Sequence, residues 1–399
     1  MDEAVRIVGA GATNLISEAD LRKKLGRGTP LRVKLGIDPT ASDIHLGFAV
    51  VLRKLRQFQD LGHTAVLILG DFTAQVGDPT GRSAARPRLA PEQIEANLAT
   101  YQAQAGLILR PDRLEVRRNS EWLGALGADG LLGLAGRATV AQMLERDDFS
   151  KRYAAGQPIS VMELLYPLLQ GYDSVAVESD VELGGTDQKF NLLLAREVQR
   201  AYGLEPQSIL TMPILPGIDG VQKMSKSLGN YVGVEDPPEE MYGKLMSISD
   251  KLMLRYYELL STQPAAHLLA VERGDLAPME AKKALAAELV GRFHGPAAAE
   301  MAARFFEERF QRRSAYEPTP IEVRTPTDEV WICQLIKEVG FAPSTSAARR
   351  LVAQGAVRVD GQPVDVDFRF RRGVNRLLEV GRRRLAAVTL VVPEGGASP

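Results

Sequence analysis

The segment from Leu31 to Leu69 constrains the fold more than any other part of the chain. It opens with a short apolar run, LRVKLGID, which ends in a turn of glycine, aspartate and proline. Apolar residues then recur at helical spacing from Phe48 to Phe58, Gly62 stops that pattern, and TAVLIL follows as a continuous apolar run. A run that is apolar on both faces is typical of a buried parallel strand. The segment therefore predicts a strand–helix–strand unit and, with it, a doubly wound α/β sheet that binds ligands beyond the carboxyl ends of its strands.

Three further stretches extend this pattern. SVAVE (Ser174–Glu178) is predicted as another strand, because GGTDQ and a helical run, FNLLLAREVQRAYG, follow it. Residues near 111 to 160 are mostly helical and charged, which indicates an insertion into the sheet domain. From about Asp236 to Gln311 the apolar spacing is helical without strands, and it predicts an α-helical domain.

The C-terminal part is set apart by a change in composition. Residues 314–329 contain three prolines and little apolar periodicity, which is typical of an interdomain linker. Two short helices follow, and then a hairpin, VRVDGQPV, with a turn at Asp360 and Gly361. We therefore expect a Rossmann-type sheet domain at 1–230, a helical domain at 231–313, a linker at 314–330 and a small α+β domain at 331–399.

Charge is divided unevenly between these parts. The net charge is −1, but residues 331–399 hold 11 basic and 6 acidic residues, which leaves 38 basic and 44 acidic residues for 1–330. A basic domain suits the phosphate backbone of a nucleic acid, although a basic surface without such a partner is the alternative. The candidate RNA contacts are arginines near a helix start, on a hairpin and on loops: Arg349, Arg350, Arg358, Arg371 and Arg372.

Composition also limits the chemistry and the compartment. One cysteine, Cys333, and four widely spaced histidines predict neither a disulfide nor a structural zinc site, so no metal site is expected. No apolar run approaches the roughly 20 residues that cross a bilayer. The first residues carry charges where a signal peptide needs an apolar region. We therefore expect a cytoplasmic protein.

The segment GIDPTASDIHLGF, from Gly36 to Phe48, leads from the first strand into the helix. Free backbone N–H groups at a helix start favour an anion, and His45 can point toward that anion. Gly47 is predicted to let a nucleotide approach the backbone, and Asp38 can bind a cation such as an ammonium. The alternative is an ordinary turn with a solvated histidine and an aspartate cap.

A second motif, KMSKS, covers Lys223 to Ser227 and lies among glycines and short polar residues, which predicts a mobile loop. Its two lysines, three residues apart, can both reach a polyphosphate. A loop that closes on a nucleotide can act on the transition state without over-stabilising the bound substrate. The alternative is a solvated surface loop.

HLG and KMSKS, in this order on an α/β body, resemble the class I aminoacyl-tRNA synthetases. GIDPTA, GDFTAQVGDPTGR, YPLLQGYDS, GGTDQ and KMSKS also occur in the order of the bacterial tyrosyl-tRNA synthetases, and the tail resembles an S4-type RNA-binding module. The resemblance implies ATP-dependent attachment of tyrosine to tRNA(Tyr), through tyrosyl-AMP and then transfer to the 3′ terminal ribose. It further implies that Mg²⁺ enters with ATP as substrate and that there is no tightly bound cofactor. The helical domain is expected to contact the anticodon side of the tRNA. The chain is expected to form a homodimer that uses the insertion as its interface.

Amino-acid activation by this route needs neither an enzyme nucleophile nor a general base, because the attacking carboxylate is already ionised. Catalysis then depends on positioning and on stabilising charge on the phosphates. The resemblance implies these phosphate donors as catalytic residues: His45, Arg82, Arg86, Lys223 and Lys226. It implies ATP contacts at Asp38, Thr40, His45, Gly47, Gly185, Asp187, Lys223, Lys226 and Ser227.

The resemblance implies tyrosine contacts at Gly36, Asp38, Thr73, Asp78, Tyr166, Gln170, Asp173 and Gln188. On a helix, Tyr166, Gln170 and Asp173 share one face, and amphipathic core packing is the alternative explanation of that spacing. Family analogy puts Tyr166, Gln170 and Asp78 around the substrate ammonium, and has Asp173 accept from the phenol hydroxyl. A buried carboxylate without its donor is costly, so phenylalanine should be rejected.

Two positions depart from the family pattern. Phe48 stands where a second histidine is usual, and Lys34 and Leu35 occupy a strand where many relatives place a tyrosine against the substrate phenol. Two other functions stay open. One is a tryptophanyl enzyme, since an acidic acceptor also suits an indole N–H, although the basic tail and the GIDPTA turn argue against it. The other is a regulatory RNA-binding protein with a retired catalytic body, which predicts decayed motifs.

Overall fold

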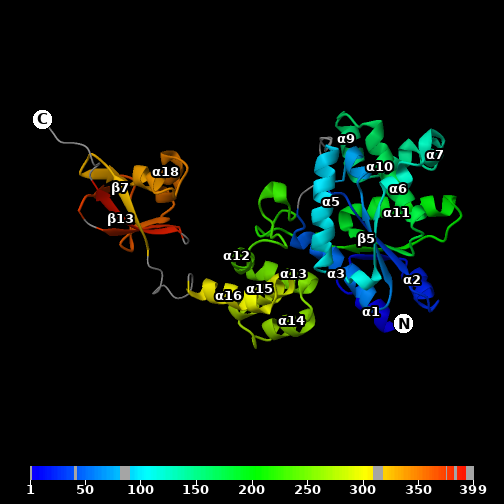
Figure 1. The fold of residues 1–399 in the computed structure, drawn as a ribbon, viewed down its shortest axis with the longest axis horizontal. Coiled ribbons are helices and arrows are strands. Elements are labelled where there is room, and N and C mark those ends of the chain that lie inside the picture. Colours follow the sequence, from blue (N-terminus) through cyan, green and yellow to red (C-terminus); the bar gives the residue numbers. More distant parts are fainter. Residues whose placement is uncertain are drawn as a thin grey trace. The chain divides into compact units, whose positions relative to one another are not determined.

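A computed structural model describes residues 2–39, 43–80, 90–308, 318–373, 375–381 and 384–391 (Figure 1). The chain divides into two compact units, Met1–Phe306 and Glu307–Pro399. One hydrophobic core contains residues of the sheet together with residues of the helices between 241 and 302, so the structure draws no line at the expected boundary of 230 and 231. Within the described ranges, no helix is both long and apolar enough to span a membrane.

The first unit is built on a six-stranded sheet in the order β1-β6-β5-β2-β3-β4. Five strands are parallel, and only β1 runs antiparallel to its neighbour β6. The strands are β1 (Asn14–Ile16), β2 (Arg32–Ile37), β3 (Thr64–Leu69), β4 (Leu114–Arg118), β5 (Val181–Gly185) and β6 (Ser208–Met212). The predicted strand–helix–strand unit is therefore confirmed by β2, α3 (Leu46–Asp60) and β3, and the doubly wound parallel sheet is confirmed with it.

Alternate residues of β2 face the two sides of the sheet. Val33, Leu35 and Ile37 join the core that α3 completes. Lys34 points to the other side, where its ammonium bonds to groups of α10 (Val161–Ala176). α10 in turn packs along α11 (Lys189–Ala201), the helix predicted after GGTDQ. Both faces of the sheet are thus covered by helices, as its doubly apolar strands require.

The prediction of a strand at SVAVE is wrong. Residues 174–176 close α10, and the parallel strand comes later, at β5. The β-branched valines favour a strand here, but Ser160 and Glu163 form a capping box that starts a long helix. The N–H of Val177 still donates to the carbonyl of Asp173. Capping and tertiary packing thus override the local strand preference.

The expected insertion also contains a strand of the main sheet. β4 pairs with β3 in parallel, so residues 114–118 belong to the sheet and not to an inserted helical segment. Four short helices follow it: α6 (Ser120–Leu123), α7 (Gly127–Ala135), α8 (Val140–Met143) and α9 (Asp147–Ala154). The other helices of this part are α1 (Asp2–Gly9), α2 (Glu18–Leu25), α4 (Thr73–Val76) and α5 (Pro91–Gly106).

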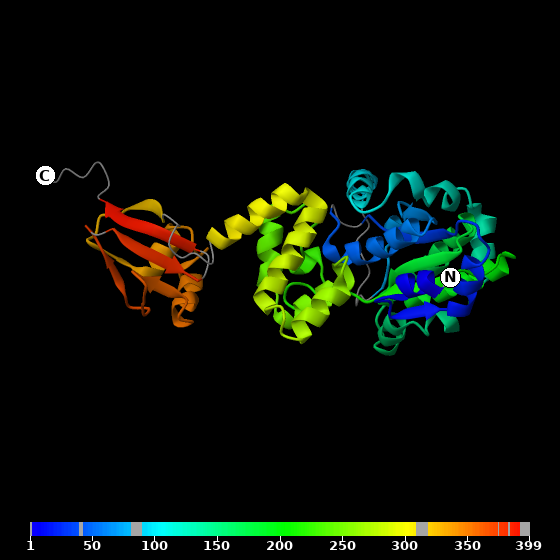
Figure 2. The ribbon, with the colours of Figure 1, turned by 90° about the horizontal axis from the view of Figure 1, so that it is seen from below.

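The helical segment after the sheet agrees with its predicted pattern, since the described residues from 238 to 306 form helices joined by short connections and contain no strand. Figure 2 shows these helices, coloured green to yellow, gathered into one bundle. They are α12 (Pro238–Ser247), α13 (Asp250–Leu260), α14 (Pro264–Glu272), α15 (Pro278–His294) and α16 (Pro296–Phe306). Four of the five begin with proline, which fits the first turn because that turn needs no backbone donor.

The second unit has a five-stranded sheet in the order β10-β9-β12-β13-β7, and β8 (Glu329–Trp331) pairs with β11 (Arg369–Arg371). The five strands are β7 (Thr319–Arg324), β9 (Val357–Val359), β10 (Gln362–Pro363), β12 (Arg376–Val380) and β13 (Arg384–Val391), and the helices are α17 (Ile332–Glu338) and α18 (Thr345–Ala353). The predicted turn at Asp360 and Gly361 joins β9 and β10, with φ of 50° and 78°. β7 lies inside the segment that the sequence predicts as an irregular linker, and its parallel pairing with β13 explains why a proline-rich stretch is extended and ordered.

Candidate active site

The candidate site lies where the order of the strands reverses. β2 pairs with β3 on one side and with β5 on the other, and open α/β sheets bind ligands at such a point. Asp38 directly follows β2, and Gly185 ends β5. Gly36 is exposed although its neighbours in β2 are buried, and a Cβ at this position would meet no atom within 4 Å. The sheet is therefore open above Gly36.

His45 is the N-cap of α3. Its Nδ1 accepts from the backbone N–H of Gly47 at 3.1 Å, so the neutral ring carries its proton on Nε2. A Cβ on Gly47 would lie 2.8 Å from Cε1 of His45. Gly47 is therefore required by the histidine ring itself, whereas the sequence suggests only room for a nucleotide. Burial, and then the charge of Lys226, lower the pKa of His45 to about 4, so at neutral pH this ring offers an uncharged donor.

Phe48 meets His45 with an aromatic contact. The ring centroids of Phe48 and His45 lie 5.1 Å apart, and Phe48 also has an edge-to-face contact with Tyr101, with centroids 6.3 Å apart. Phe48 thus packs against the histidine at the position where the family pattern has a polar side chain.

HLG and KMSKS lie side by side, although about 180 residues separate them in the sequence. The backbone N–H of Leu46 donates to the carbonyl of Val232 at 2.9 Å, and that of Val234 donates to Ile44 at 3.0 Å. The ammonium of Lys226 pairs with the carboxylate of Asp43, two residues before His45. The structure therefore brings the helix start and the lysine loop together.

In the KMSKS loop, exposed and half-buried residues surround one buried residue. Met224 is buried, and its N–H donates to the carbonyl of Leu215 at 2.9 Å. Asn230 donates to the carbonyl of Lys223 at 3.1 Å, and the hydroxyls of Ser225 and Ser227 lie 2.9 Å apart. Lys223 is exposed, and its charge opposes the rise in the pKa of Asp187 that burial causes.

Asp38 organises one wall of the site. Its Oδ1 accepts from the hydroxyl of Thr73 at 2.7 Å, and its Oδ2 accepts from the hydroxyl of Tyr166 at 2.8 Å. Burial, followed by the charge of Asp38, raises the pKa of Tyr166 well above its usual range, so the phenol stays a donor. Three residues predicted around tyrosine are thus joined in one network.

Asp173 is buried on α10, at i+7 from Tyr166. Its carboxylate accepts from the indole N–H of Trp122 at 2.8 Å and from the amide of Asn119 at 3.4 Å. Asn119 also donates to the hydroxyl of Thr73 at 2.9 Å. Burial raises the pKa of Asp173 to about 7, although Lys34, Trp122 and Asn119 act against this rise.

Sequence reasoning misses both Trp122 and Asn119. The available signal is position, because Asn119 directly follows the carboxyl end of β4, at the same edge of the sheet as Asp38. When residues 111–160 are taken as an insertion, the strand that ends just before Asn119 is not recognised from the sequence. With β4 in the sheet, a polar residue at its end becomes a site candidate.

A second polar cluster lies at the start of α11. Gln188 donates to Asp78 at 2.8 Å, and Gln170 donates to Glu182 at 3.4 Å. Both glutamine carbonyls accept from the amide of Asn191, at 2.9 Å for Gln170 and 3.0 Å for Gln188. The predicted tyrosine contacts Asp78, Gln170 and Gln188 therefore belong to one hydrogen-bonded group.

Lys34 forms a buried ion pair beneath this cluster. Its ammonium lies 2.9 Å from the carboxylate of Glu182, and both side chains are at most 1% exposed. It also donates to the carbonyl of Gln170 at 3.0 Å and to the hydroxyl of Ser174 at 2.6 Å. Leu35 faces the opposite side of the sheet, in the core with α3. Lys34 thus supports α10 from below.

Some predicted residues fall elsewhere. Thr40, Arg82 and Arg86 lie outside the described residues. Gly185 lies beside the site, where a Cβ would come 2.4 Å from Oδ1 of Asp187. The carboxylate of Asp187 therefore requires a glycine next to it.

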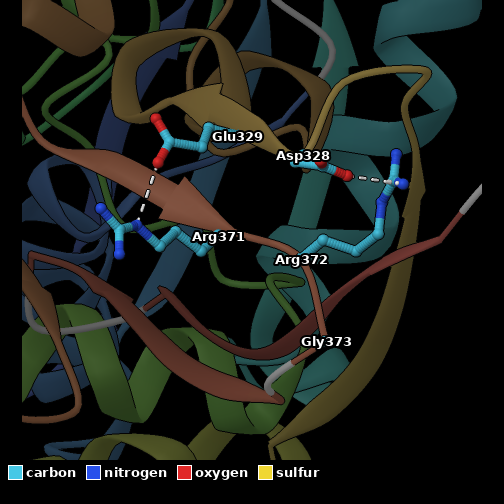
Figure 3. Close-up of a pocket in the computed structure, with 5 residues that line it drawn as sticks. All are labelled: Asp328, Glu329, Arg371, Arg372 and Gly373. Carbon is cyan, nitrogen blue, oxygen red and sulfur yellow. Dashed lines mark ion pairs between the residues drawn. The ribbon is translucent and has the colours of Figure 1, made fainter.

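The arginines of the second unit have different surroundings. Arg349, Arg350 and Arg358 are exposed. Figure 3 shows Arg371 and Arg372 in a pocket with Asp328 and Glu329. Arg371 pairs with Glu329 at 3.0 Å and Arg372 with Asp328 at 2.8 Å.

Arg372 is bound further into the protein. Its guanidinium donates to the carbonyls of Thr325 and Thr327, at 2.9 Å each, and so holds the turn between β7 and β8. Four of the predicted RNA contacts are therefore exposed, and one of them, Arg371, is also paired with Glu329. The fifth, Arg372, is half-buried and paired with Asp328.

Comparison with known proteins adds to this geometry. Residues 27–311 match the family model described as tRNA synthetases class I (W and Y), and residues 330–374 match the S4 domain. A tyrosine–tRNA ligase of Moorella thermoacetica is 51% identical over 96% of this chain and 94% of its own length. A tyrosine–tRNA ligase of Bordetella pertussis is 53% identical over 96% of both chains. The solved tyrosyl-tRNA synthetase of Archaeoglobus fulgidus, in complex with L-tyrosine, is 25% identical with a TM-score of 0.62, over 76% of this chain and 99% of its own.

Proposed function

Because this chain belongs to the family of class I tRNA synthetases (W and Y), we propose that it attaches tyrosine to tRNA(Tyr) in two ATP-dependent steps. In the first step the tyrosine carboxylate attacks the α-phosphate of ATP, and pyrophosphate leaves. In the second step the tyrosyl group passes from tyrosyl-AMP to the 3′ terminal ribose of the tRNA. Curated relatives near 50% identity over almost the full chain are tyrosine–tRNA ligases, which supports tyrosine as the substrate.

The phosphate chemistry falls to the two paired motifs. His45 offers an Nε2–H donor at the start of α3, and Lys223 and Lys226 add positive charge from the KMSKS loop. Donors of this kind stabilise charge that develops on phosphate oxygens. Charge-assisted hydrogen bonds contribute about 1.5 to 3 kcal/mol each. Mg²⁺ enters with ATP as part of the substrate, since a polyphosphate carries it.

Asp173 carries the choice of amino acid. Its buried carboxylate lies on α10, two turns from Tyr166, and accepts from the phenol hydroxyl of tyrosine. Phenylalanine offers no further donor, so the buried carboxylate would keep only Trp122 and Asn119 as partners, which selects against phenylalanine. The ammonium of tyrosine lies among Tyr166, Gln170 and Asp78, on the same side of the sheet as the exposed Gly36. This buried acceptor is the observation that best supports a substrate with a phenol group.

We further propose a homodimer that uses the helices after β4. Four large apolar side chains in this region are between 64% and 74% exposed: Leu132, Val140, Tyr153 and Val161. Exposed apolar side chains gathered in one segment mark an interaction site. A second copy of the chain is the partner that family membership favours, and a cytoplasmic location follows from a role in translation.

The second unit serves tRNA binding in this proposal. Its S4 match and its exposed Arg349, Arg350 and Arg358 support contacts with an RNA backbone. The helical segment 231–313 approaches the anticodon side of the tRNA, and the boundaries of 1–230, 231–313, 314–330 and 331–399 remain our functional division of the chain.

Pyrophosphate exchange into ATP tests the first step with each amino acid in turn. Tyrosine should support exchange, and phenylalanine should not. Exchange with tryptophan in place of tyrosine would overturn the substrate assignment. No exchange with any amino acid would instead favour a regulatory RNA-binding protein.

A further inference from the structure

Arg146 lies behind the tyrosine pocket, between α8 and α9, and is buried. Its guanidinium donates to Oδ1 of Asn191 at 3.2 Å, to the hydroxyl of Thr80 at 2.8 Å and to Asp148 at 2.9 Å. Asn191 is also buried and lies on α11, one turn after Gln188. Neither Arg146 nor Asn191 is among the residues assigned a role above.

The chemistry of these groups fixes the orientation of Asn191. A guanidinium has donors and no acceptor, so Asn191 must turn its oxygen toward Arg146. Its amide nitrogen then faces the other way, where its two N–H groups reach Oε1 of Gln170 at 2.9 Å and Oε1 of Gln188 at 3.0 Å.

The orientation passes on to the two glutamines. Because each presents its oxygen to Asn191, each turns its nitrogen to a carboxylate, Glu182 for Gln170 and Asp78 for Gln188. A carbonyl oxygen has two lone pairs, so the oxygen of Gln170 can accept a second donor. An ammonium only donates, and it can therefore bind Gln170 only in this orientation.

We propose that Arg146 and Asn191 are positioning residues that set the amide orientation of Gln170 and Gln188 for the ammonium of tyrosine. This proposal rests on the proposed function, which places that ammonium beside Gln170 and Asp78. Arg146 acts on the two glutamines through Asn191, and its guanidinium also lies 3.7 Å from Oδ1 of Asp78. Loss of this positive charge acting alone would tighten the binding of an ammonium, so it cannot imitate the loss of affinity that a wrong amide orientation causes. The segment between α8 and α9 thereby contributes to the amino-acid pocket from outside it.

Asn191→Asp is the discriminating variant because it replaces only the amide nitrogen with an oxygen. An aspartate accepts and cannot donate, so both glutamines must rotate and turn N–H groups toward the ammonium. We expect the Kd for tyrosine to rise at least about tenfold. The added negative charge acting alone would tighten the binding of an ammonium, so the two explanations predict opposite signs.

The ligand pair separates orientation from general damage to the pocket. Isothermal titration with the full-length protein compares tyrosine with 3-(4-hydroxyphenyl)propionate, which lacks only the ammonium. In Asn191→Asp the affinity for tyrosine should fall, whereas the affinity for the propionate should stay within about twofold of the wild-type value. A twofold change is far smaller than the loss of affinity expected when one charge-assisted hydrogen bond is removed. Equal loss for both ligands, or unchanged or tighter binding of tyrosine, would overturn the proposal. A wild-type protein that binds neither ligand would instead refute the proposed function.

A matched pair at Arg146 tests the same idea without altering α11. Lysine also only donates, so Arg146→Lys should keep tyrosine affinity within about threefold of wild type. Glutamine can present either an oxygen or a nitrogen to Asn191, so Arg146→Gln should weaken tyrosine about tenfold and spare the propionate, in line with the loss of an oriented acceptor for a charged donor. Equal affinities for tyrosine in the two Arg146 variants would contradict the role of Arg146. This test holds even if Asn191→Asp fails to fold.

Discussion

The carboxyl group of Asp173 should make tyrosine binding depend on pH. Burial raises its pKa to about 7 from an ordinary 3.8, and a phenol hydroxyl donates most strongly to the ionised carboxylate. With a pKa of about 7, roughly one tenth of these groups are ionised at pH 6 and about nine tenths at pH 8. We therefore expect the Kd for tyrosine to fall about tenfold from pH 6 to pH 8, while the weak binding of phenylalanine does not improve.

Trp122 provides a direct assay, because its indole N–H donates to Asp173 and the chain has only two tryptophans. In Trp331→Phe the fluorescence of Trp122 should titrate with a midpoint near pH 7, and saturating tyrosine should lower that midpoint. His45 does not titrate in this range, since burial and Lys226 lower its pKa to about 4. Asp173→Asn in the same background is the control and should remove the titration.

Stability gives an independent check with a definite sign. The folded-state pKa of Asp173 is raised, so the folded protein keeps a proton that the unfolded chain releases between about pH 3.8 and 7. This contribution to the free energy of unfolding is present below pH 3.8 and is lost as the pH rises through 7. A pKa difference of about three units corresponds to a decrease of about 4 kcal/mol at most in the free energy of unfolding over this pH range. In Asp173→Asn this pH-dependent decrease should be absent. A flat Trp122 titration together with tyrosine affinity independent of pH would refute the reasoning.

Changes at the nucleotide motifs and in the second unit should separate three activities. Gly47→Ala places a Cβ 2.8 Å from the ring of His45, so pyrophosphate exchange should slow at least about tenfold while tyrosine affinity stays unchanged. A tenfold loss is the scale of one lost charge-assisted hydrogen bond. An unchanged exchange rate would show that the position of the His45 ring is unimportant. Lys226→Ala should slow tyrosyl-AMP formation about 10- to 100-fold in single-turnover measurements, and weaker tyrosine binding would show that the loop is misplaced. Removal of residues 318–399 should spare exchange and weaken tRNA charging, and intact charging at physiological salt would contradict an RNA role for this unit.

Sequence reasoning succeeds where local chemistry determines the outcome. TAVLIL is apolar on both faces and becomes a central strand, and the Asp360-Gly361 turn forms because these residues accept positive φ. SVAVE fails for the complementary reason, since its valines suit a strand but a capping box fourteen residues earlier starts a helix that includes them. A prediction from the residues of SVAVE alone does not include the capping box at which this helix starts.

The site shows the same division. His45, Lys226 and Tyr166 belong to recognisable motifs, and the structure brings each into the expected neighbourhood. Trp122, Asn119 and Arg146 lie in a segment without a motif, and they reach the site only through the pairing of β4 and the packing of α8 and α9. Contacts that depend on tertiary structure therefore require the structure to be found.

The pairing of β7 with β13 has a consequence for how the protein is made. Among the described strands of the second unit, β7 is the first to leave the ribosome and β13 is the last, and β7 has β13 as its neighbour in the sheet. About 60 residues separate them, which takes roughly 3 to 12 s at usual rates of bacterial synthesis. During this interval the first unit can fold completely while β7 waits as an unpaired strand. A premature stop before residue 384 would thus leave a finished catalytic unit that carries an unfinished RNA-binding unit.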